Sequence, residues 1–204
     1  MRVAVLGAGV IGVTSAWYLA RAGHAVTLVD RQPQAGMETS FANGGQISAG
    51  HAEPWARPSV LPKLLQWLGR EDAPLLFRPR ADLAQWRWGL RFLLECVPGR
   101  FERNRQQLAG LAAYSQSCLG ELRAETGIQY DQLSRGILQF CTEQSELDAL
   151  AAHGPTKTAA ECLQIEPALR ASRVAVLGGA YVAGDESGDA HEFTRQLAQR
   201  AEAL

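Results

Sequence analysis

The sequence predicts an α/β fold whose core is a parallel sheet, and three observations in its first thirty residues predict it. Residues 2–6 form a short apolar run rich in β-branched side chains, which is typical of a buried strand. A glycine-rich turn, residues 7–12, follows at once, and the alanine-rich segment 13–22 favours a helix. A second apolar run, residues 25–29, ends at Asp30, about 20 residues beyond the glycines. Together these parts stand in the order of a dinucleotide-binding βαβ unit.

Each glycine of the turn has a physical role in such a unit. Gly7 allows the tight turn out of the first strand, Gly9 lets the backbone approach a pyrophosphate, and Gly12 permits close packing of helix on strand. The helix N-terminus offers unpaired N–H groups and a partial positive charge to phosphates. Asp30 can accept hydrogen bonds from ribose hydroxyls and repels a 2′-phosphate, which disfavours NADP. The predicted phosphate loop is Gly7, Ala8, Gly9, Val10, Ile11 and Gly12.

Composition and charge exclude several classes of protein. The 204 residues suffice for one core or for one and a half domains, and the net charge of -1 implies no bulk attraction to nucleic acid. The four cysteines and four histidines are scattered, which predicts free thiols and neither a disulfide framework nor a metal site. Three glycines interrupt the first apolar stretch, so we expect no secretory signal peptide, and no apolar run is long enough to span a membrane.

A second loop distinguishes a flavin-binding domain from a nicotinamide-binding domain. A nicotinamide domain would pass from Asp30 through a short loop into another helix and strand. Residues 31–36 instead form a turn-rich linker, and residues 38–48 combine small hydroxyl side chains, an Asn-Gly-Gly sequence and a short apolar segment. Such a loop lets the backbone come close to an anion. The alternative is an ordinary Asn-Gly turn between two strands.

Joined to the first motif, this loop resembles the amino-terminal region of the D-amino-acid oxidase superfamily of FAD enzymes, and within it the bacterial dehydrogenases of D-amino acids. The likeness lies in residues 5–12, 15–19, 22–24, 29–31, 38–40, 43–48 and 54–56. It recurs in residues 113–115, 122–126, 128–130, 166–169 and 185–189. The resemblance implies an FAD-binding, Rossmann-like parallel sheet of the GR2 type with part of an α+β substrate domain.

The resemblance also implies a cofactor and a reaction. FAD would place its pyrophosphate between the first loop and residues Ser40, Asn43, Gly44 and Gly45, with Asp30 and Arg31 at the adenosine. Gln46 and Ile47 would lie toward the isoalloxazine ring. The implied reaction is oxidative deamination: hydride leaves the Cα of a D-amino acid, and water hydrolyses the imino acid to a 2-oxo acid and ammonia. The electrons would pass to a quinone or another electron carrier.

The middle of the chain, residues 55–105, is rich in tryptophan and arginine. Prolines divide it into short helices, predicted at 60–69 and 82–97. One interpretation buries the tryptophans in a helical core with the arginines facing water. The other is an interfacial membrane contact, which a dehydrogenase that reduces quinone would need. The predicted location is the cytoplasm, and the second interpretation adds a peripheral position on the inner face of the plasma membrane.

Periodicity predicts the remaining elements. A long helix is expected over 99–126, with its apolar face formed by Leu108, Leu111, Ala112, Ser115, Leu119 and Leu122. Runs 128–133 and 136–142 predict a β-hairpin, and residues 143–169 should be helical or irregular. A strand at 180–182 and a helix capped by Asp189, with Glu192 at its third position, follow. The last helix should feed a further strand, so we expect a truncated chain.

The predicted domain organisation is residues 1–52 for FAD binding, 53–172 for a helical segment and partial substrate domain, and 173–204 for a return to the FAD-binding domain. A further half or partner chain would then supply the substrate contacts. No catalytic residue can be assigned; His51 and Tyr130 are local candidates, each more often structural. The first hypothesis is an FAD-dependent D-amino-acid dehydrogenase. The alternatives are a flavin-binding fragment without activity and an NAD-dependent dehydrogenase.

Overall fold

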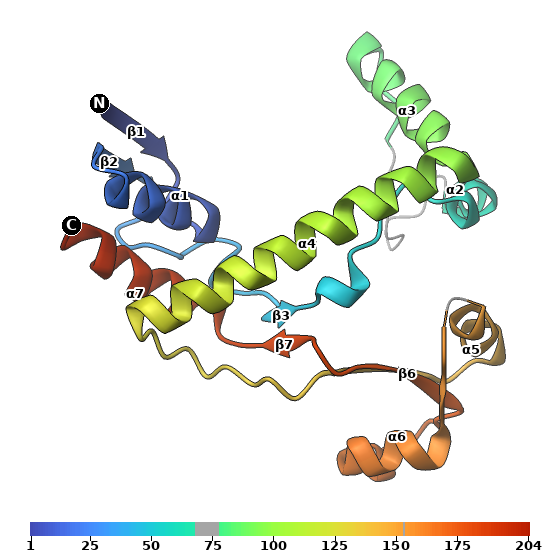
Figure 1. The fold of residues 1–204 in the computed structure, drawn as a ribbon. Helices are drawn as coiled ribbons and strands as arrows, with labels where there is room; N and C mark the ends of the chain where they lie inside the picture. The colour runs from blue at the N-terminus through green and yellow to red at the C-terminus, as the bar shows by residue number, and fades with distance from the viewer. Residues whose placement is uncertain (68–77, 153) are drawn as a thin grey trace. The chain divides into compact units, whose positions relative to one another are not determined.

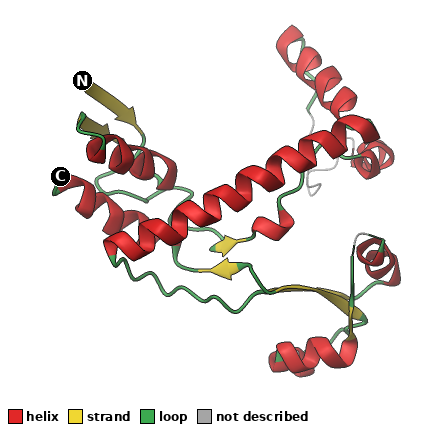
Figure 2. Cartoon of the chain, in the orientation of Figure 1, coloured by secondary structure: helices red, strands yellow, loops and turns green. Residues whose placement is uncertain are grey.

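The computed structural model describes residues 1–67, 78–152 and 154–204. It divides into two units, one formed by residues 1–50 with 116–204 and the other by residues 51–115 (Figure 1). The first unit is mixed helix and strand, and the described part of the second is helical (Figure 2).

The first unit begins with the predicted βαβ unit. Strands β1 (Arg2–Leu6) and β2 (Ala25–Val29) pair in parallel, from Arg2 opposite Ala25 to Leu6 opposite Val29. Helix α1 (Val10–Arg21) connects them and begins three residues earlier than predicted. The Ser40 hydroxyl accepts a hydrogen bond from the Val10 N–H at 3.0 Å, which caps the helix inside the glycine turn. A contact from 30 residues away thus extends the helix, and local sequence could not show it.

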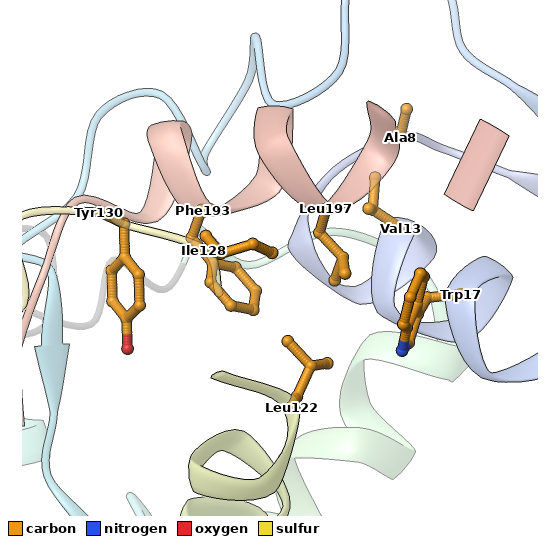
Figure 3. Packing of buried hydrophobic residues seen from close by; sticks show 8 residues of the cluster. All are labelled: Ala8, Val13, Trp17, Leu122, Ile128, Tyr130, Phe193 and Leu197. Atoms are coloured by element: carbon orange, nitrogen blue, oxygen red, sulfur yellow. The ribbon is translucent and has the colours of Figure 1, made fainter. Parts of the chain in front are cut away.

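The core of this unit forms where three helices meet (Figure 3). Helix α7 (Ala190–Glu202) packs on α1, and Val13 and Leu197 are fully buried between them. Trp17 of α1 and Leu122 of α4 (Pro98–Thr126) belong to the same cluster, whose other buried members are Ala8, Ile128, Tyr130 and Phe193. The predicted cap of α7 is confirmed, because an Asp189 carboxylate oxygen accepts the Glu192 N–H at 2.9 Å.

Two antiparallel sheets complete the first unit. Strand β3 (Gln46–Ile47) pairs with β7 (Glu186–Ser187). Strands β4 (Ile137–Cys141), β6 (Gly178–Val182) and β5 (Lys157–Thr158) form a sheet in the order β4-β6-β5, and the strand predicted at 180–182 lies within β6. Helices α5 (Gln144–Ala151) and α6 (Ala159–Ile165) and a 3-10 helix (Pro167–Ala171) occupy most of the region predicted to be helical or irregular, which also contains β5.

The predicted β-hairpin is wrong. Strand β4 pairs with β6 and not with residues 128–133, of which Leu133 forms a single bridge to Ser187. Ile128 and Tyr130 alternate with exposed residues because both enter the helical core, at 1% and 3% exposure. The alternation of buried and exposed residues that predicted a strand therefore comes from an irregular segment that buries every second side chain.

A 3-10 helix at Ala49–His51 connects the first unit to the second, where a 3-10 helix at Pro58–Val60 leads into α2 (Leu61–Trp67). Helix α3 (Leu83–Glu95) and the first part of α4 follow. The helices predicted at 82–97 and 99–126 are confirmed to within a few residues. The helix predicted at 60–69 corresponds to α2, and its residues 68 and 69 lie outside the described residues. No helix in the described ranges is long and apolar enough to cross a membrane.

Burial in the helical region contradicts one of the two interpretations of its tryptophans, the helical core. Trp55 is 84% exposed and Trp86 and Trp88 are 52% exposed, so these tryptophans do not fill a helical core. On α4, Leu111 is 63% exposed, whereas Leu119 and Leu122 pack in the first unit. Helical periodicity locates an apolar face but does not say what covers it.

Candidate cofactor site

A cavity of about 780 Å³ lies within the first unit, a size typical of small-molecule sites. The end of β1, the start of α1, residues 39–47 and the start of α7 surround it. Every predicted site residue lines it except Ala8, Asp30, Arg31 and Gly44. The two loops predicted from sequence therefore meet at one concave surface.

The glycine turn shapes one wall of the cavity. Gly7 has a φ of +102°, and its N–H donates to the Val29 carbonyl at 2.7 Å. A Cβ on Gly12 would fall 1.7 Å from the Gly7 carbonyl oxygen, so the expected close packing at Gly12 is confirmed. The first N–H to bond within the helix is that of Val13, to the Gly9 carbonyl at 3.0 Å. The N–H groups of Ile11 and Gly12 thus remain for an anion at the helix N-terminus.

Asn43 organises the opposite wall. Its side-chain amide donates to the carbonyls of Thr39 and Ser40 at 3.1 Å each, and its oxygen accepts the Gly45 N–H at 2.7 Å. Gly45 has a φ of +60°, and a Cβ there would lie 2.3 Å from the Gly188 carbonyl oxygen. Because β3 pairs with the distant β7 and turns precede Asn43, this loop is no simple turn between paired strands. The Asn43 side chain holds the loop, which leaves backbone and hydroxyl groups to face the cavity.

Ser40 joins the two loops. Its side-chain oxygen accepts the Val10 N–H, and the Cβ position of Gly9 is 3.4 Å from that oxygen. A hydroxyl that accepts one hydrogen bond still has its proton to donate. Ser40 is 8% exposed, so the proton sits in a sheltered position beside the N-terminus of α1. Two helix N–H groups, a hydroxyl and the absence of a side chain at Gly9 together fit a diphosphate.

Asp30 and Arg31 lie outside this cavity. The Asp30 carboxylate accepts the N–H groups of Ala8 at 2.5 Å and Gln32 at 2.7 Å. These hydrogen bonds hold the pKa of Asp30 below its usual value. Ala8 and Asp30 line a second cavity of about 690 Å³ on the β2 and α7 side. The exposed Arg31 side chain pairs with Glu38, at 2.9 Å from Nε and 2.8 Å from Nη2.

Sequence reasoning missed several cavity residues. Thr39 precedes the predicted Ser40 and carries the same hydroxyl chemistry, so its sequence position gave a usable signal. Ser15, Leu119, Gly188 and Phe193 also line the cavity, and no local pattern marks them.

The two local catalytic candidates have different positions. Tyr130 lines the cavity at 3% exposure, and its hydroxyl accepts a hydrogen bond from Arg123 at 3.2 Å. His51 belongs to the second unit and is not among the residues that line this cavity. Within the described ranges, no cluster of histidine, cysteine or carboxylate side chains could hold a metal ion.

Comparison with known proteins identifies the family of the chain. Residues 2–204 match the family model described as FAD dependent oxidoreductase, DAO. The chain belongs to this family. The resemblance predicted from the two loops is therefore confirmed, as are the α/β FAD-binding fold class and a family that depends on FAD.

Among curated relatives, the D-amino acid dehydrogenase of Dechloromonas aromatica is 58% identical over 213 residues, covering 100% of this chain and 51% of the relative. The D-amino acid dehydrogenase of Agrobacterium fabrum is 45% identical over 212 residues, covering 99% of this chain and 51% of the relative. The chain thus spans about half the length of the curated relatives it matches.

Solved structures share the fold at lower identity. Glycine oxidase from Bacillus cereus has a TM-score of 0.60 at 20% identity, over 98% of this chain and 44% of the oxidase. L-α-glycerophosphate oxidase from Mycoplasma pneumoniae, with FAD bound, has a TM-score of 0.58 at 17% identity, over 98% of this chain and 42% of that protein. These neighbours establish the fold alone, because identity is low.

Proposed function

We propose that this chain is the FAD-binding half of a dehydrogenase that oxidises D-amino acids to 2-oxo acids and ammonia. The observation that carries the proposal is the convergence of the α1 N-terminus and the Ser40 loop on one cavity. The relatives at 58% identity named D-amino acid dehydrogenase supply the substrate class. An NAD-dependent enzyme is disfavoured, because the family model that matches residues 2–204 is described as FAD dependent oxidoreductase.

The cavity residues have distinct roles in this proposal. The N–H groups of Ile11 and Gly12 and the Ser40 hydroxyl would hold the pyrophosphate of FAD. Gln46 and Ile47, which form strand β3, would lie toward the isoalloxazine ring. Asp30 and Arg31 would serve the adenosine end; the Asp30 oxygens retain lone pairs beyond the two N–H groups they accept.

FAD, when bound, would supply the hydride acceptor for the substrate Cα. The chain contributes orientation and exclusion of water, because Leu119, Ile47 and Phe193 form an apolar part of the cavity lining. Electrons would then pass to a quinone or another electron carrier. The remaining half of the protein, whether on the same polypeptide or on a partner chain, would supply the substrate contacts.

We further propose that α3 makes a peripheral contact with the inner face of the plasma membrane, from the cytoplasm. Its residues Leu83, Trp86, Leu90, Leu93 and Leu94 recur at spacings of three and four and are 44–83% exposed. Arg87 and Arg91 are exposed beside this face and suit anionic lipid headgroups. Co-sedimentation with anionic vesicles, lost in Leu90→Glu but retained in Gln106→Glu on the exposed surface of α4, would support the contact. Equal sedimentation of both variants would contradict it.

A flavin-binding fragment without turnover is the second candidate, because the cavity residues with a proposed role bind the cofactor and none has an assigned role toward the substrate. One experiment separates the two functions. The purified chain is mixed with FAD, and its visible spectrum is followed anaerobically while D-amino acids, or matched L-amino acids, are added. Bleaching by the D-enantiomers alone indicates a working dehydrogenase site. If neither enantiomer changes the flavin spectrum, the remaining half is added to the chain: bleaching by the D-enantiomers then supports the dehydrogenase, and an unchanged spectrum supports the fragment. No bound flavin refutes both.

A further inference from the structure

A half-buried ion pair connects the end of α4 to strand β7. Arg123 Nη1 forms a short hydrogen bond with Glu186 Oε2, and Nη2 lies 3.2 Å from Oε1. The two side chains are 17% and 14% exposed. The Arg195–Glu192 pair within α7 has similar two-point geometry but is 41% and 32% exposed. Arg123–Glu186 is therefore the more desolvated of the two.

This pair contacts two parts of the cavity wall. Glu186 is the register partner of Ile47, which lines the cavity from β3. Arg123 Nη1 also donates to the hydroxyl of Tyr130, at 3.2 Å. One guanidinium thus bonds both the strand that pairs with β3 and the tyrosine at the cavity wall.

Close packing makes that wall sensitive to small displacements. A Cβ on Gly188 would lie 2.4 Å from the Tyr130 ring, so the ring rests directly on the backbone that follows β7. The Asp189 N–H donates to the Tyr130 carbonyl at 2.7 Å, and Gln116 of α4 donates to the Gly184 carbonyl at 2.6 Å. If β7 shifts, both Tyr130 and the backbone around Gly45, which accepts the Gly188 N–H, have to move.

The Arg123–Glu186 pair is charged at neutral pH, and this charge favours one relative position of α4 and β7. The hydrogen bond from Arg123 holds the pKa of Glu186 below its usual value, so the carboxylate remains ionised at neutral pH. A buried ion pair adds little net stability, because desolvation offsets most of the attraction. Its directional hydrogen bonds nevertheless favour one relative position of the groups it joins.

We propose that Arg123 is a positioning residue of the cofactor cavity: it fixes β7, and with it Ile47 and Tyr130, in the arrangement that receives FAD. The inference rests on the proposed function, in that the cavity is taken to bind FAD. It adds a residue that does not line the cavity and that acts through its neighbours.

The test measures the dissociation constant for FAD in the chain and in four variants. Arg123→Lys keeps the charge but loses the two-point bond, Glu186→Gln keeps the shape but loses the charge, and Tyr130→Phe removes one hydroxyl. Arg195→Lys, which disrupts the exposed pair within α7, is the matched control. We expect the dissociation constant to rise about tenfold for Arg123→Lys and Glu186→Gln, as for loss of an orienting partner at metal sites. The control should stay within about twofold, as for an exposed pair.

Two further readouts distinguish positioning from a general loss of stability. Without FAD, amide hydrogen exchange in Arg123→Lys should accelerate at Ile47 and Glu186 but not in β1 and β2, whereas global destabilisation would affect all of them. The double variant Arg123→Lys/Glu186→Gln should bind FAD no more weakly than either single variant, because the two residues act as a unit. Should Arg123→Lys not fold, Glu186→Gln and Tyr130→Phe carry the same comparison.

The outcomes separate this inference from the proposed function. Unchanged FAD affinity in folded Arg123→Lys and Glu186→Gln, with normal binding by the unsubstituted chain, overturns the positioning role alone. Amide exchange that is faster to the same extent in the β1–β2 and β3–β7 sheets also overturns the positioning role. An unsubstituted chain that is folded but binds no FAD overturns the proposed function and this inference with it.

Discussion

The substitution Gly12→Ala tests the packing of the glycine turn most sharply. A Cβ at this position would lie 1.7 Å from the Gly7 carbonyl oxygen and 2.9 Å from its carbon, both backbone atoms that cannot rotate away. Helix α1 would have to move off strand β1, at the point where both line the cavity. Forced overpacking costs up to about 3 kcal/mol. The higher helix propensity of alanine returns up to about 1 kcal/mol.

We therefore expect Gly12→Ala to lose about 2 kcal/mol of unfolding free energy, which lowers the melting temperature of a chain of this size by about 4–8 °C. The matched control is Gly110→Ala in α4, where a Cβ would meet no heavy atom within 4 Å. The control should gain about 0.5–1 kcal/mol from helix propensity. The assay is thermal and urea unfolding of both variants without FAD. A Gly12→Ala chain as stable as the unsubstituted one would refute the packing argument.

Substitutions at three other positions test the cavity and the carboxylate beside the glycine turn. Gly9→Val should abolish FAD binding in a folded chain by placing a side chain against Ser40 and in the path of the pyrophosphate; stoichiometric FAD in that variant would contradict the assignment. Ser40→Ala should lose about 1 kcal/mol of stability, the usual value of a helix cap, and bind FAD more weakly, whereas Ser40→Thr should keep both properties. The folded-state pKa of Asp30 is lowered, so its stabilising effect is present above the unfolded value of about 3.9 and is lost as the pH falls further. Asp30→Asn should therefore flatten the acid limb of the stability curve; an unchanged limb in acid titration would show that the Ala8 contact contributes nothing.

The first thirty residues could be interpreted from sequence because their structure is local. A strand, a tight turn and a helix follow from residue type and spacing, and the clash at Gly12 is the reason a glycine stands there. The second loop could be predicted by its Asn-Gly-Gly composition, although the side chain of Asn43 serves the loop itself. Where backbone geometry dictates residue type, sequence analysis was sufficient.

The features that the sequence did not predict depend on contacts between segments that are far apart in the chain. Strand β4 pairs with β6, about forty residues away, and sequence periodicity carries no information on pairing partners. The hydrogen bond from the Ala8 N–H to Asp30 spans 22 positions and could not be predicted locally, while the role of Asp30 at the ribose stays a prediction. The helix α3 has the amphipathic pattern of a core helix, yet its tryptophans are exposed. The predicted domain boundaries at 52 and 172, and the assignment of individual site residues to FAD, stay predictions.

The central claim is that the two loops of this chain form an FAD site. The most direct measurement is the ratio of FAD to protein after the purified chain is saturated with FAD and passed through gel filtration, with Gly9→Val as the comparison. We expect equimolar, tightly retained flavin in the unsubstituted chain and none in the folded variant. A folded chain that emerges without flavin, or a variant that retains it equally, would contradict the account.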